Sequence, residues 1–447
     1  MTMFDPNMMA TQMAQIFVQK PQQAVDMKSA QLKARRDALN DLQKSMQAFK
    51  TSLGDLTRKK SMVAMGASFS KEGVGSVTAT GQAQPGSYSL FVKQVATAHQ
   101  VSYGQLAGSD AAGKLTVGQG SETFDVDLSA ADNDKDGVLS VQEMALAINR
   151  AEGNAGKVSA MVVSVGGEDQ LVLSSGKTGE KHAVTLSASD NPVLAGKLAD
   201  AANFKELNRA QDAIVMLGGE TTGVEIRQDS NKFTAIQGVT MTFTQAMKPG
   251  ETLQLDVTRN QDDTKGNVQA FVDAFNTLVK KLDEITASGN AESGKKAGPL
   301  ANDSAIRALR SKLNELTRGV YDGVKLADLG LSASRDGSLQ LDADKLEKAL
   351  AKDPSVLDRY FGGTDGKSGS LSKLTDYMDT WLKSTDGLIK RRKDSEDAQQ
   401  KTLDKRQDAI DRQYDQAFQR YLKQYTQLQA MQVQMSRTLE MMNGYFA

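Results

Sequence analysis

The sequence predicts an α+β multidomain protein: a long antiparallel helical coiled-coil stalk built from both termini, carrying an inserted β-rich head of two subdomains. Three observations predict this class. Near both ends of the 447-residue chain, apolar residues recur at alternating steps of three and four, the spacing of a coiled-coil seam. The middle shows short alternating runs broken by glycine, asparagine and aspartate, as antiparallel strands do. With 39% hydrophobic residues, the chain can bury several cores.

The N-terminal part of the stalk is predicted from a seam that runs on from Leu32. Its members are Leu39, Leu42, Met46, Phe49, Leu53, Leu56 and Val63. The segment before it differs, because residues 1–27 carry only Asp5, Lys20 and Asp26 as charges, among many Met and Gln. Such a helix is sticky when isolated. We therefore expect residues 1–31 to be an assembly helix that is disordered when free, with a frayed tail as the alternative.

The C-terminal end repeats this pattern. Its seam consists of Ile410, Tyr414, Ala417, Tyr421, Leu428, Met431, Met435 and Met442. Gly and Pro are absent from Leu388 to Asn443, which favours one very long helix. Residues 413–447 are rich in Gln and Met, so we expect a second assembly helix there. The two terminal seams most simply bury each other in opposite directions.

The predicted head lies between these ends. Alternating runs predict strands at residues 87–92, 159–165, 170–173, 223–227 and 252–257. Two helices are expected among them, at Val141 to Ala151 and around Asn203 to Asp212. We divide the head into an inner subdomain, 70–108 with 206–260, and an outer subdomain, 109–205.

A helical pattern returns after Asp263. Phe271, Phe275, Leu278, Val279 and Leu282 have helical spacing, and a further helix is expected from Ala305 to Thr317 after a Gly/Ser/Lys-rich loop. Residues 32–69 with 261–412 are therefore predicted to form the helical stalk, or leg.

One motif carries specific chemistry. DNDKDGVLSVQE, residues 132–143, fits the twelve-residue calcium loop D-x-[DN]-x-[DN]-G-x5-E. Ca²⁺ takes six to eight oxygen ligands. The predicted ligands are the side chains of Asp132, Asp134 and Asp136, the carbonyl of Val138, the hydroxyl of Ser140 or a water, and a bidentate Glu143.

The surroundings of this loop favour a modest role. Residues 123–128 alternate like a strand, whereas an EF-hand needs an incoming helix, and the sequence has no second loop of this kind. The alternative interpretation is a surface turn in which Ser140 caps the next helix and Glu143 completes a capping box. Both interpretations can hold together. We expect a single structural Ca²⁺ site, or at least a capped turn, that stiffens the head.

Several function classes are not supported by the sequence. A formal net charge of -1 gives no electrostatic case for nucleic acid or an anionic membrane. There is no cysteine, so disulfides and thiolate chemistry are excluded. No apolar run reaches the roughly 18 residues of a membrane span, and the N-terminus lacks the features of a cleaved signal peptide. Neither His99 nor His182 has a catalytic or ligand companion, and the loop 362–368 misses the phosphate-loop spacing. We predict no enzyme.

Several blocks together resemble one known family. They are PGSYSLFVKQVATAHQVSY (85–103), IQGVTMTF (236–243), GETLQLDV (250–257), FVDAFNTLVKKLDEI (271–285), GPLANDSAIRALRSKL (298–313), residues 328–361 and the closing helix ending QLQAMQVQMSRTLEMMNGYF. In this order they are similar to the flagellar filament-capping family FliD, also called flagellar hook-associated protein 2. The match covers most of the chain, although the acidic loop departs from the pattern expected of the family.

The resemblance implies a structural cap at the tip of the bacterial flagellar filament. It implies a ring of about five or six subunits that retains exported flagellin and promotes its folding and insertion. The implied partners are other copies of the chain, flagellin, hook–filament junction proteins and an export chaperone. It also implies an extracellular location, reached by flagellar type III export without a cleaved signal peptide.

Two rival functions stay open at this point. One is a surface adhesin that uses the exposed head as a binding module, which can coexist with capping at a filament tip. The other is a calcium-regulated switch, for which a chelator would change the oligomeric state or motility.

Overall fold

The computed structural model describes residues 5–290, 292, 294–363 and 367–445. The chain forms two compact units, residues 1–63 with 261–447 and residues 64–260, and each is described separately below. Helix makes up 47% and strand 25% of the chain, so the mixed α and β class is confirmed. The supercoiling of the stalk, the two head subdomains and the finer domain division stay predictions.

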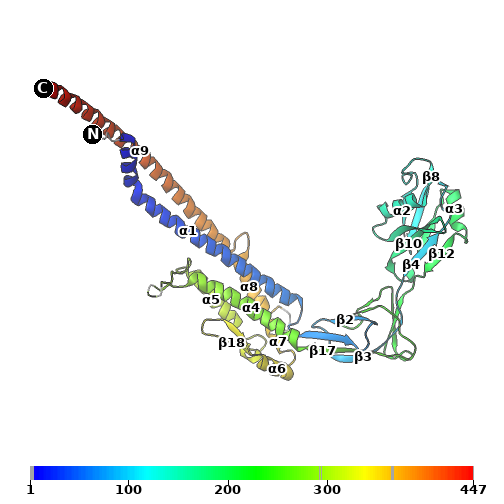
Figure 1. The fold of residues 1–447 in the computed structure, drawn as a ribbon. Coiled ribbons are helices and arrows are strands. Elements are labelled where there is room, and N and C mark those ends of the chain that lie inside the picture. The colour runs from blue at the N-terminus through cyan, green and yellow to red at the C-terminus, as the bar shows by residue number, and fades with distance from the viewer. Residues whose placement is uncertain (1–4, 291, 293, 364–366, 446–447) are drawn as a thin grey trace. The chain divides into compact units, whose positions relative to one another are not determined.

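The first unit is organised by its two terminal helices, α1 (Pro6–Arg58) and α9 (Leu388–Tyr445), which lie side by side (Figure 1). Asp5 caps α1 by accepting a hydrogen bond from the backbone N–H of Asn7 at 2.8 Å. The helices run in opposite directions, because residues late in α1 meet residues early in α9. The connecting pairs are Gln22 with Gln407, Arg35 with Glu396, Arg36 with Asp397 and Gln43 with Lys393.

The predicted N-terminal seam is the buried face of α1. Leu39, Leu42, Met46, Phe49 and Leu53 are at most 1% exposed. Besides α9, this face packs against α4 (Gln261–Thr286) and α8 (Ser370–Leu382). Phe49 meets Phe275 of α4 edge to face, with ring centroids 6.1 Å apart. The long helix predicted from the absence of Gly and Pro is confirmed.

Shorter elements complete this unit around α4. They are α5 (Ser304–Thr317), the hairpin β18 (Leu331–Ala333) and β19 (Leu339–Leu341), α6 (Ala343–Lys352) and α7 (Val356–Phe361). The helix predicted at Ala305 to Thr317 is confirmed by α5. The last four elements were not predicted, and the two strands, with three residues each, are too short for an alternating run to stand out. The loop predicted at 362–368 lies partly outside the described residues.

The second unit contains a five-stranded sheet in the order β1-β17-β3-β13-β14. These strands are Ala64–Phe69, Leu253–Asn260, Gly86–Gln94, Ala213–Leu217 and Val224–Gln228. A three-stranded sheet, β15-β16-β2, is built from Lys232–Phe233, Val239–Phe243 and Gly75–Ala79. All pairings in both sheets are antiparallel, as predicted.

A second group of sheets surrounds helix α2 (Val141–Arg150). One sheet has the order β12-β4-β10-β9, from strands Phe204–Asn208, Ala98–Tyr103, Glu168–Thr178 and Val158–Val165; another, β11-β6-β7, uses Val184–Ser187, Lys114–Gln119 and Glu122–Asp127. The short strands β5 (Ser109–Asp110) and β8 (Val138–Leu139) pair next to α2, and α3 (Pro192–Ala199) lies beside β5. The core contains Val101, Leu115, Leu139, Ile148 and Leu171.

One predicted helix is wrong. Residues around Asn203 to Asp212 form strand β12, which pairs antiparallel with β4 through partners such as Phe204 and Tyr103. The rings of these two residues are 5.3 Å apart. The local sequence has ordinary helix formers, but pairing with an existing strand and this ring contact outweigh a weak helix preference.

The residues through which the first unit leads into β1 are held by a carboxylate that sequence reasoning did not identify. Asp358 of α7 accepts hydrogen bonds from the Ser61 hydroxyl and the Met62 N–H, both at 2.7 Å. Asn267 of α4 donates to the Met62 carbonyl at 3.0 Å. Burial raises the pKa of Asp358 above its ordinary value, although these hydrogen bonds lower it. We call these hydrogen bonds of Asp358 and Asn267 with Ser61 and Met62 the polar clamp.

Removing this carboxylate is expected to destabilise the first unit. Asp358→Ala leaves the Met62 N–H without its acceptor and the Ser61 hydroxyl with only the Val63 carbonyl, which costs about 1–3 kcal/mol of unfolding free energy. Asp358→Asn keeps one acceptor oxygen, so its unfolding free energy should fall by less. Chemical denaturation measures both, with the exposed Asp376→Ala as control.

The pH dependence gives a second check on Asp358. Because its folded-state pKa is raised, its titration adds stability that is fully present below the unfolded-state pKa and lost as pH rises through the folded value. The unfolding free energy of the wild-type protein should therefore rise relative to that of Asp358→Asn as the pH is lowered. An Asp358→Ala variant as stable as the Asp376→Ala control would contradict the clamp.

Candidate functional site

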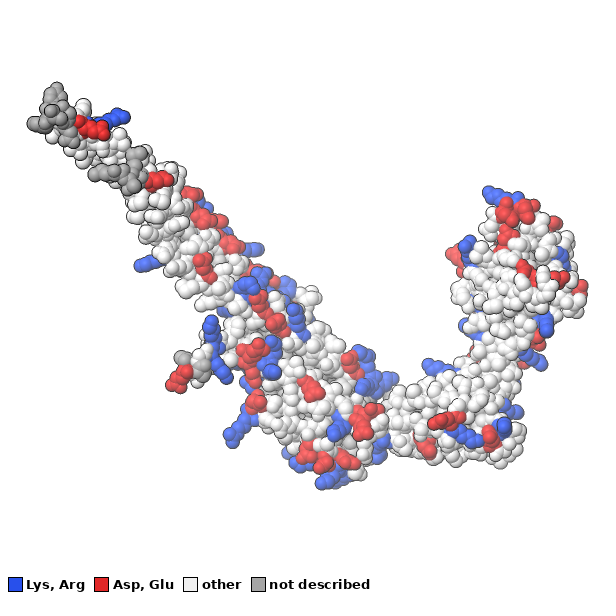
Figure 2. All heavy atoms as spheres, in the orientation of Figure 1, with Lys and Arg blue, Asp and Glu red and all other residues white. Residues whose placement is uncertain are grey.

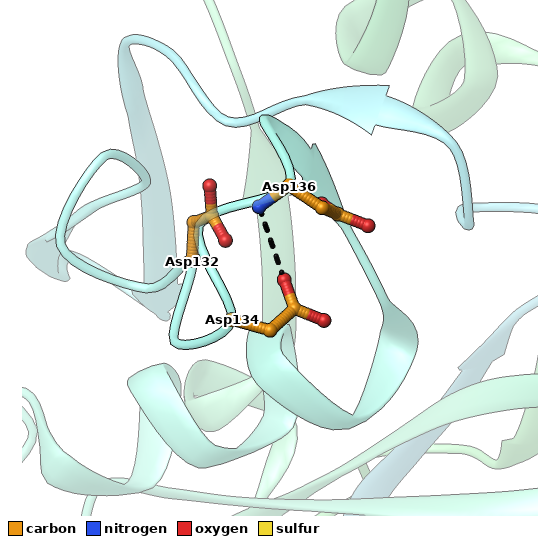
Figure 3. A group of neighbouring side chains, drawn as sticks. All are labelled: Asp132, Asp134 and Asp136. Atoms are coloured by element: carbon orange, nitrogen blue, oxygen red, sulfur yellow. Dashed lines mark hydrogen bonds between the residues drawn. The ribbon is translucent and has the colours of Figure 1, made fainter.

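The acidic loop brings three carboxylates together just before α2 (Figure 3). Asp132, Asp134 and Asp136 each offer one oxygen, and these oxygens lie within 4.8 Å of one another. Within the described residues, this is the only group of three or more His, Cys, Asp or Glu side chains found to converge in this way. The alternating spacing predicted from the motif therefore does gather the side chains on one turn.

The turn is shaped by the aspartates themselves. Asp132 accepts hydrogen bonds from the N–H groups of Lys135 at 2.7 Å and Gly137 at 3.0 Å. Asp134 accepts from the Asp136 N–H at 3.2 Å, the dashed line in Figure 3. Gly137 has φ +81°, with no atom within 4 Å of the position a Cβ would take. A left-handed conformation here suits glycine, so the sixth residue of the motif has a structural reason.

The other three predicted ligands lie differently. Val138 starts β8 and pairs with Asp110. Ser140 is the N-cap of α2, and with Glu143 it forms the predicted capping box. Both carboxylate oxygens of Glu143 are engaged, one by the Asn133 N–H at 2.8 Å and the other by the Ser140 N–H and hydroxyl at 3.0 and 2.7 Å. Glu143 therefore holds the loop through hydrogen bonds from Asn133 and Ser140 and is not part of the aspartate group.

The pKa values of Glu143 and Asp134 are shifted in opposite directions. The backbone N–H and hydroxyl of Ser140, together with the Asn133 N–H, hold the pKa of Glu143 below its ordinary value. For Asp134, the Asp136 N–H lowers the pKa, but desolvation and the nearby carboxylates of Asp136 and Glu143 outweigh it, so the pKa is raised. Mutual repulsion among the aspartates is the condition that a bound cation would relieve.

The two histidines have structural surroundings. His99 accepts a hydrogen bond from the Val184 N–H at Nδ1, at 2.8 Å, and its Nε2 lies 3.2 Å from Glu206. His182 contacts Asp229 at 3.3 Å. Each imidazole thus links neighbouring strands or turns of the second unit.

A second candidate is the distal end of α9. α1 covers the seam of α9 as far as Ala417, which is 1% exposed. From residue 418 to residue 442 no residue of α9 is buried. The seam continues through Leu428, Met431, Met435 and Met442, which are 44%, 62%, 62% and 51% exposed. Figure 2 shows that few charged side chains cover this end of the helix pair. We call the four seam residues Leu428, Met431, Met435 and Met442 the uncovered seam.

This seam is unusual for a surface helix. Its apolar residues keep the three-and-four spacing of the part that α1 buries, so the pattern that elsewhere specifies a helical partner has none within the described residues. A contiguous apolar surface of this kind is typical of an interaction site. No helix in the described part of the chain is both long and apolar enough to cross a membrane.

Comparison with known proteins assigns the family. The chain matches the model for the flagellar hook-associated protein 2 N-terminus over residues 2–99 and the one for its C-terminus over residues 210–437. The lateral flagellar hook-associated protein 2 of Vibrio parahaemolyticus is 36% identical over 384 residues, 84% of each chain. The flagellar hook-associated protein 2 of Escherichia coli K12 is 26% identical, over 92% of this chain and 90% of the relative. The chain belongs to the flagellar hook-associated protein 2 family.

A solved structure supports the same assignment. The crystal structure of the D1-D2-D3 domains of the flagellar cap protein FliD from Escherichia coli has a TM-score of 0.66 to this chain, at 26% sequence identity. The structural match covers 80% of this chain and 99% of that chain. The family resemblance predicted from the sequence blocks is confirmed. The acidic loop at 132–143 and the strands around it lie between the two matched family segments.

The capping box gives a direct test of how the loop is braced. Ser140→Ala is expected to cost about 1 kcal/mol of unfolding free energy, because it removes the cap of α2. The pKa of Glu143 is lowered on folding, so its contribution is present above its unfolded-state pKa, roughly 4.3, and is lost as pH falls through the folded value. Urea denaturation from neutral to acid pH measures both effects. A Ser140→Ala variant of wild-type stability would contradict the box.

Proposed function

We propose that this protein caps a bacterial flagellar filament, where a ring of identical copies at the tip retains exported flagellin and promotes its folding and insertion. Family membership over both terminal helices carries the proposal. It is supported by the likeness to the Escherichia coli protein, a flagellar cap. The fold also suits a structural role, because its largest feature is a pair of long helices, and the apolar seam of α9 continues past Ala417, the last buried seam residue among those described.

The uncovered seam is the part of the chain that we assign to assembly. Met431 and Met435 are each 62% exposed at the distal end of α9, which carries few charged side chains. In water this surface is unfavourable, and its burial against another helix would be worth roughly 25 cal/mol per Å² of apolar area. The partner is accordingly a low-charge amphipathic helix, from another copy of this chain or from the filament. Export without a cleaved signal and contact with junction proteins and an export chaperone remain expectations of the family resemblance.

Adding charge to the uncovered seam tests this assignment. Met431→Glu with Met435→Glu should abolish capping, because two carboxylates cannot be buried without partners. The unfolding free energy should stay unchanged, since both side chains are exposed. Thr426→Glu with Ser436→Glu places equal charge on the opposite face and should cap normally. Flagellin shed into the medium, measured by immunoblot in a null strain carrying each variant, is the readout.

The outcomes separate the candidate functions. A null strain that keeps full-length filaments and sheds no flagellin would contradict the cap. A strain that loses attachment while its filaments grow normally would favour the adhesin. A seam variant that caps as well as its control would leave the cap standing and exclude the seam as its assembly surface.

As a second proposal, the acidic loop binds one Ca²⁺ ion that stiffens the second unit without regulating assembly. The convergence of Asp132, Asp134 and Asp136 supports this proposal. The Val138 carbonyl, the Ser140 hydroxyl and Glu143 follow in the order of the motif and could join the ion together with water. For Glu143 to bind bidentately, its carboxylate would have to leave the capping box, so a Glu143 that stays in place implies a weaker site.

Calorimetric titration with CaCl₂ tests the metal proposal. The wild-type protein should bind one ion and unfold at a higher temperature with Ca²⁺ than with chelator. Asp132→Ala with Asp134→Ala should abolish both effects, whereas the exposed Glu152→Ala should keep them. Binding should weaken as pH falls, because protons compete for carboxylates that repel one another. Equal heats for the double variant and the wild type would contradict the site.

A further inference from the structure

The uncovered seam is built from methionine where the covered seam uses other residues. Along the part of α9 that α1 buries, the seam residues include Leu403, Ile410 and Ala417, which are at most 8% exposed. Beyond it, Met431, Met435 and Met442 are 62%, 62% and 51% exposed. In contrast, Met46 and Met378, in the core of the same unit, are 0% exposed. The chain thus places oxidisable thioethers along an apolar face of α9 on which no residue from 418 to 442 is buried.

We propose that Met431, Met435 and Met442 form a modification site at which peroxide oxidation switches off the uncovered seam. The proposal rests on the assembly role assigned to that seam above. In the reaction a thioether sulfur attacks one oxygen of hydrogen peroxide, and the O–O bond breaks. The sulfur keeps one oxygen as a sulfoxide and is oxidised by two electrons, while the other oxygen leaves as water.

The product has a different surface chemistry from the thioether. A sulfoxide is polar and accepts hydrogen bonds, so a seam that carries three of them can no longer be buried against an apolar helix face without a desolvation penalty. Met431 and Met435 lie four residues apart, and Met442 follows after seven, so all three lie on one face of the helix. Oxidation of any one of the three methionines therefore weakens the contact that all three side chains form together.

Oxidation of this site leaves the fold intact. None of the three side chains is buried, and the seam beyond Ala417 has no buried residue up to residue 442. The sulfoxides would therefore change binding without changing the free energy of unfolding. Oxidation of Met46 or Met378 would instead place a polar group in the core and destabilise the unit. The two kinds of damage are distinguishable by their effect on stability.

The test uses the full-length protein and hydrogen peroxide. Sulfoxide formation, followed by peptide mass spectrometry, should be at least about tenfold faster at Met431, Met435 and Met442 than at Met46 and Met378, because access governs the rate. Protein oxidised to completion at the seam is then supplied to cells that lack their own copy, and filament elongation is measured. We expect elongation to fall at least about tenfold, with an unchanged denaturation midpoint.

Two variants make the test specific. Met431→Leu, Met435→Leu and Met442→Leu together keep the seam apolar, so this variant should support elongation before and after peroxide. Met161→Leu with Met441→Leu removes two exposed methionines, 50% and 64% exposed, that lie off the seam, and it should lose elongation on oxidation as the wild type does. Oxidised wild type that still elongates filaments, or an oxidised leucine variant that does not, would overturn the proposal.

The same variants distinguish the oxidation proposal from the assembly role on which it rests. If the untreated leucine variant caps and the Met431→Glu, Met435→Glu variant does not, the seam is an assembly surface, and only the peroxide result decides on oxidation. If the glutamate variant caps normally, the assembly role itself fails. In that case slow and equal oxidation of all methionines would still contradict the modification site independently.

Discussion

The pairing of α1 and α9 in opposite directions is the constraint on which the first unit depends. In proteins most of the stability of a helix comes from packing of its apolar face, and each of these two helices buries its seam against the other and against α4 or α8. The register is fixed by polar contacts in the interface. Arg35 binds Glu396 at 2.9 Å, and the Glu396 side chain is only 4% exposed. A slip along the helices would leave that charge buried without its partner.

This register also determines which part of α9 stays open. Phe17 of α1 lies under the guanidinium of Arg420, 5.6 Å from the ring centroid, so the described part of α1 reaches this level of α9. The seam nevertheless continues in the same phase toward Met442. An apolar seam that keeps the spacing for pairing, while Leu428, Met431, Met435 and Met442 stay exposed among the described residues, is the physical basis of the proposed assembly role. The methionines on it supply a flexible apolar face that adapts to more than one helix surface.

Much of this architecture follows from periodicity, which the sequence shows directly. The spacing of Leu39, Leu42 and Met46 and the absence of Gly and Pro after Leu388 identify both terminal helices. Long-range contacts carry no such signal. Phe204 sits in β12 because Tyr103 and the β4 edge are there to receive it, and Asp358 clamps Met62 from 296 residues away along the chain. A lone carboxylate in a short helix gives no pattern that would reveal that role.

The acidic loop is intermediate between these cases. Its motif correctly places Asp132, Asp134 and Asp136 on one turn, and Ser140 with Glu143 in a capping box. The motif alone cannot decide whether Glu143 serves the helix or an ion, because the same residue satisfies both patterns. In the structure its oxygens bind the Asn133 N–H and Ser140. Both oxygens are thus engaged in the capped turn, and a bidentate role at an ion would require Glu143 to leave it.

Amide hydrogen exchange along α9 tests the central claim most directly. In the free protein, residues 422–442 should exchange much faster than residues 395–417, since buried residues of α9 such as Ile410 and Ala417 lie in the latter range. In the assembled state, on filament tips, the protection of residues 422–442 should rise toward that of residues 395–417. Exchange in residues 422–442 that is equally fast in the free and assembled states would contradict the assignment of the uncovered seam as the assembly surface.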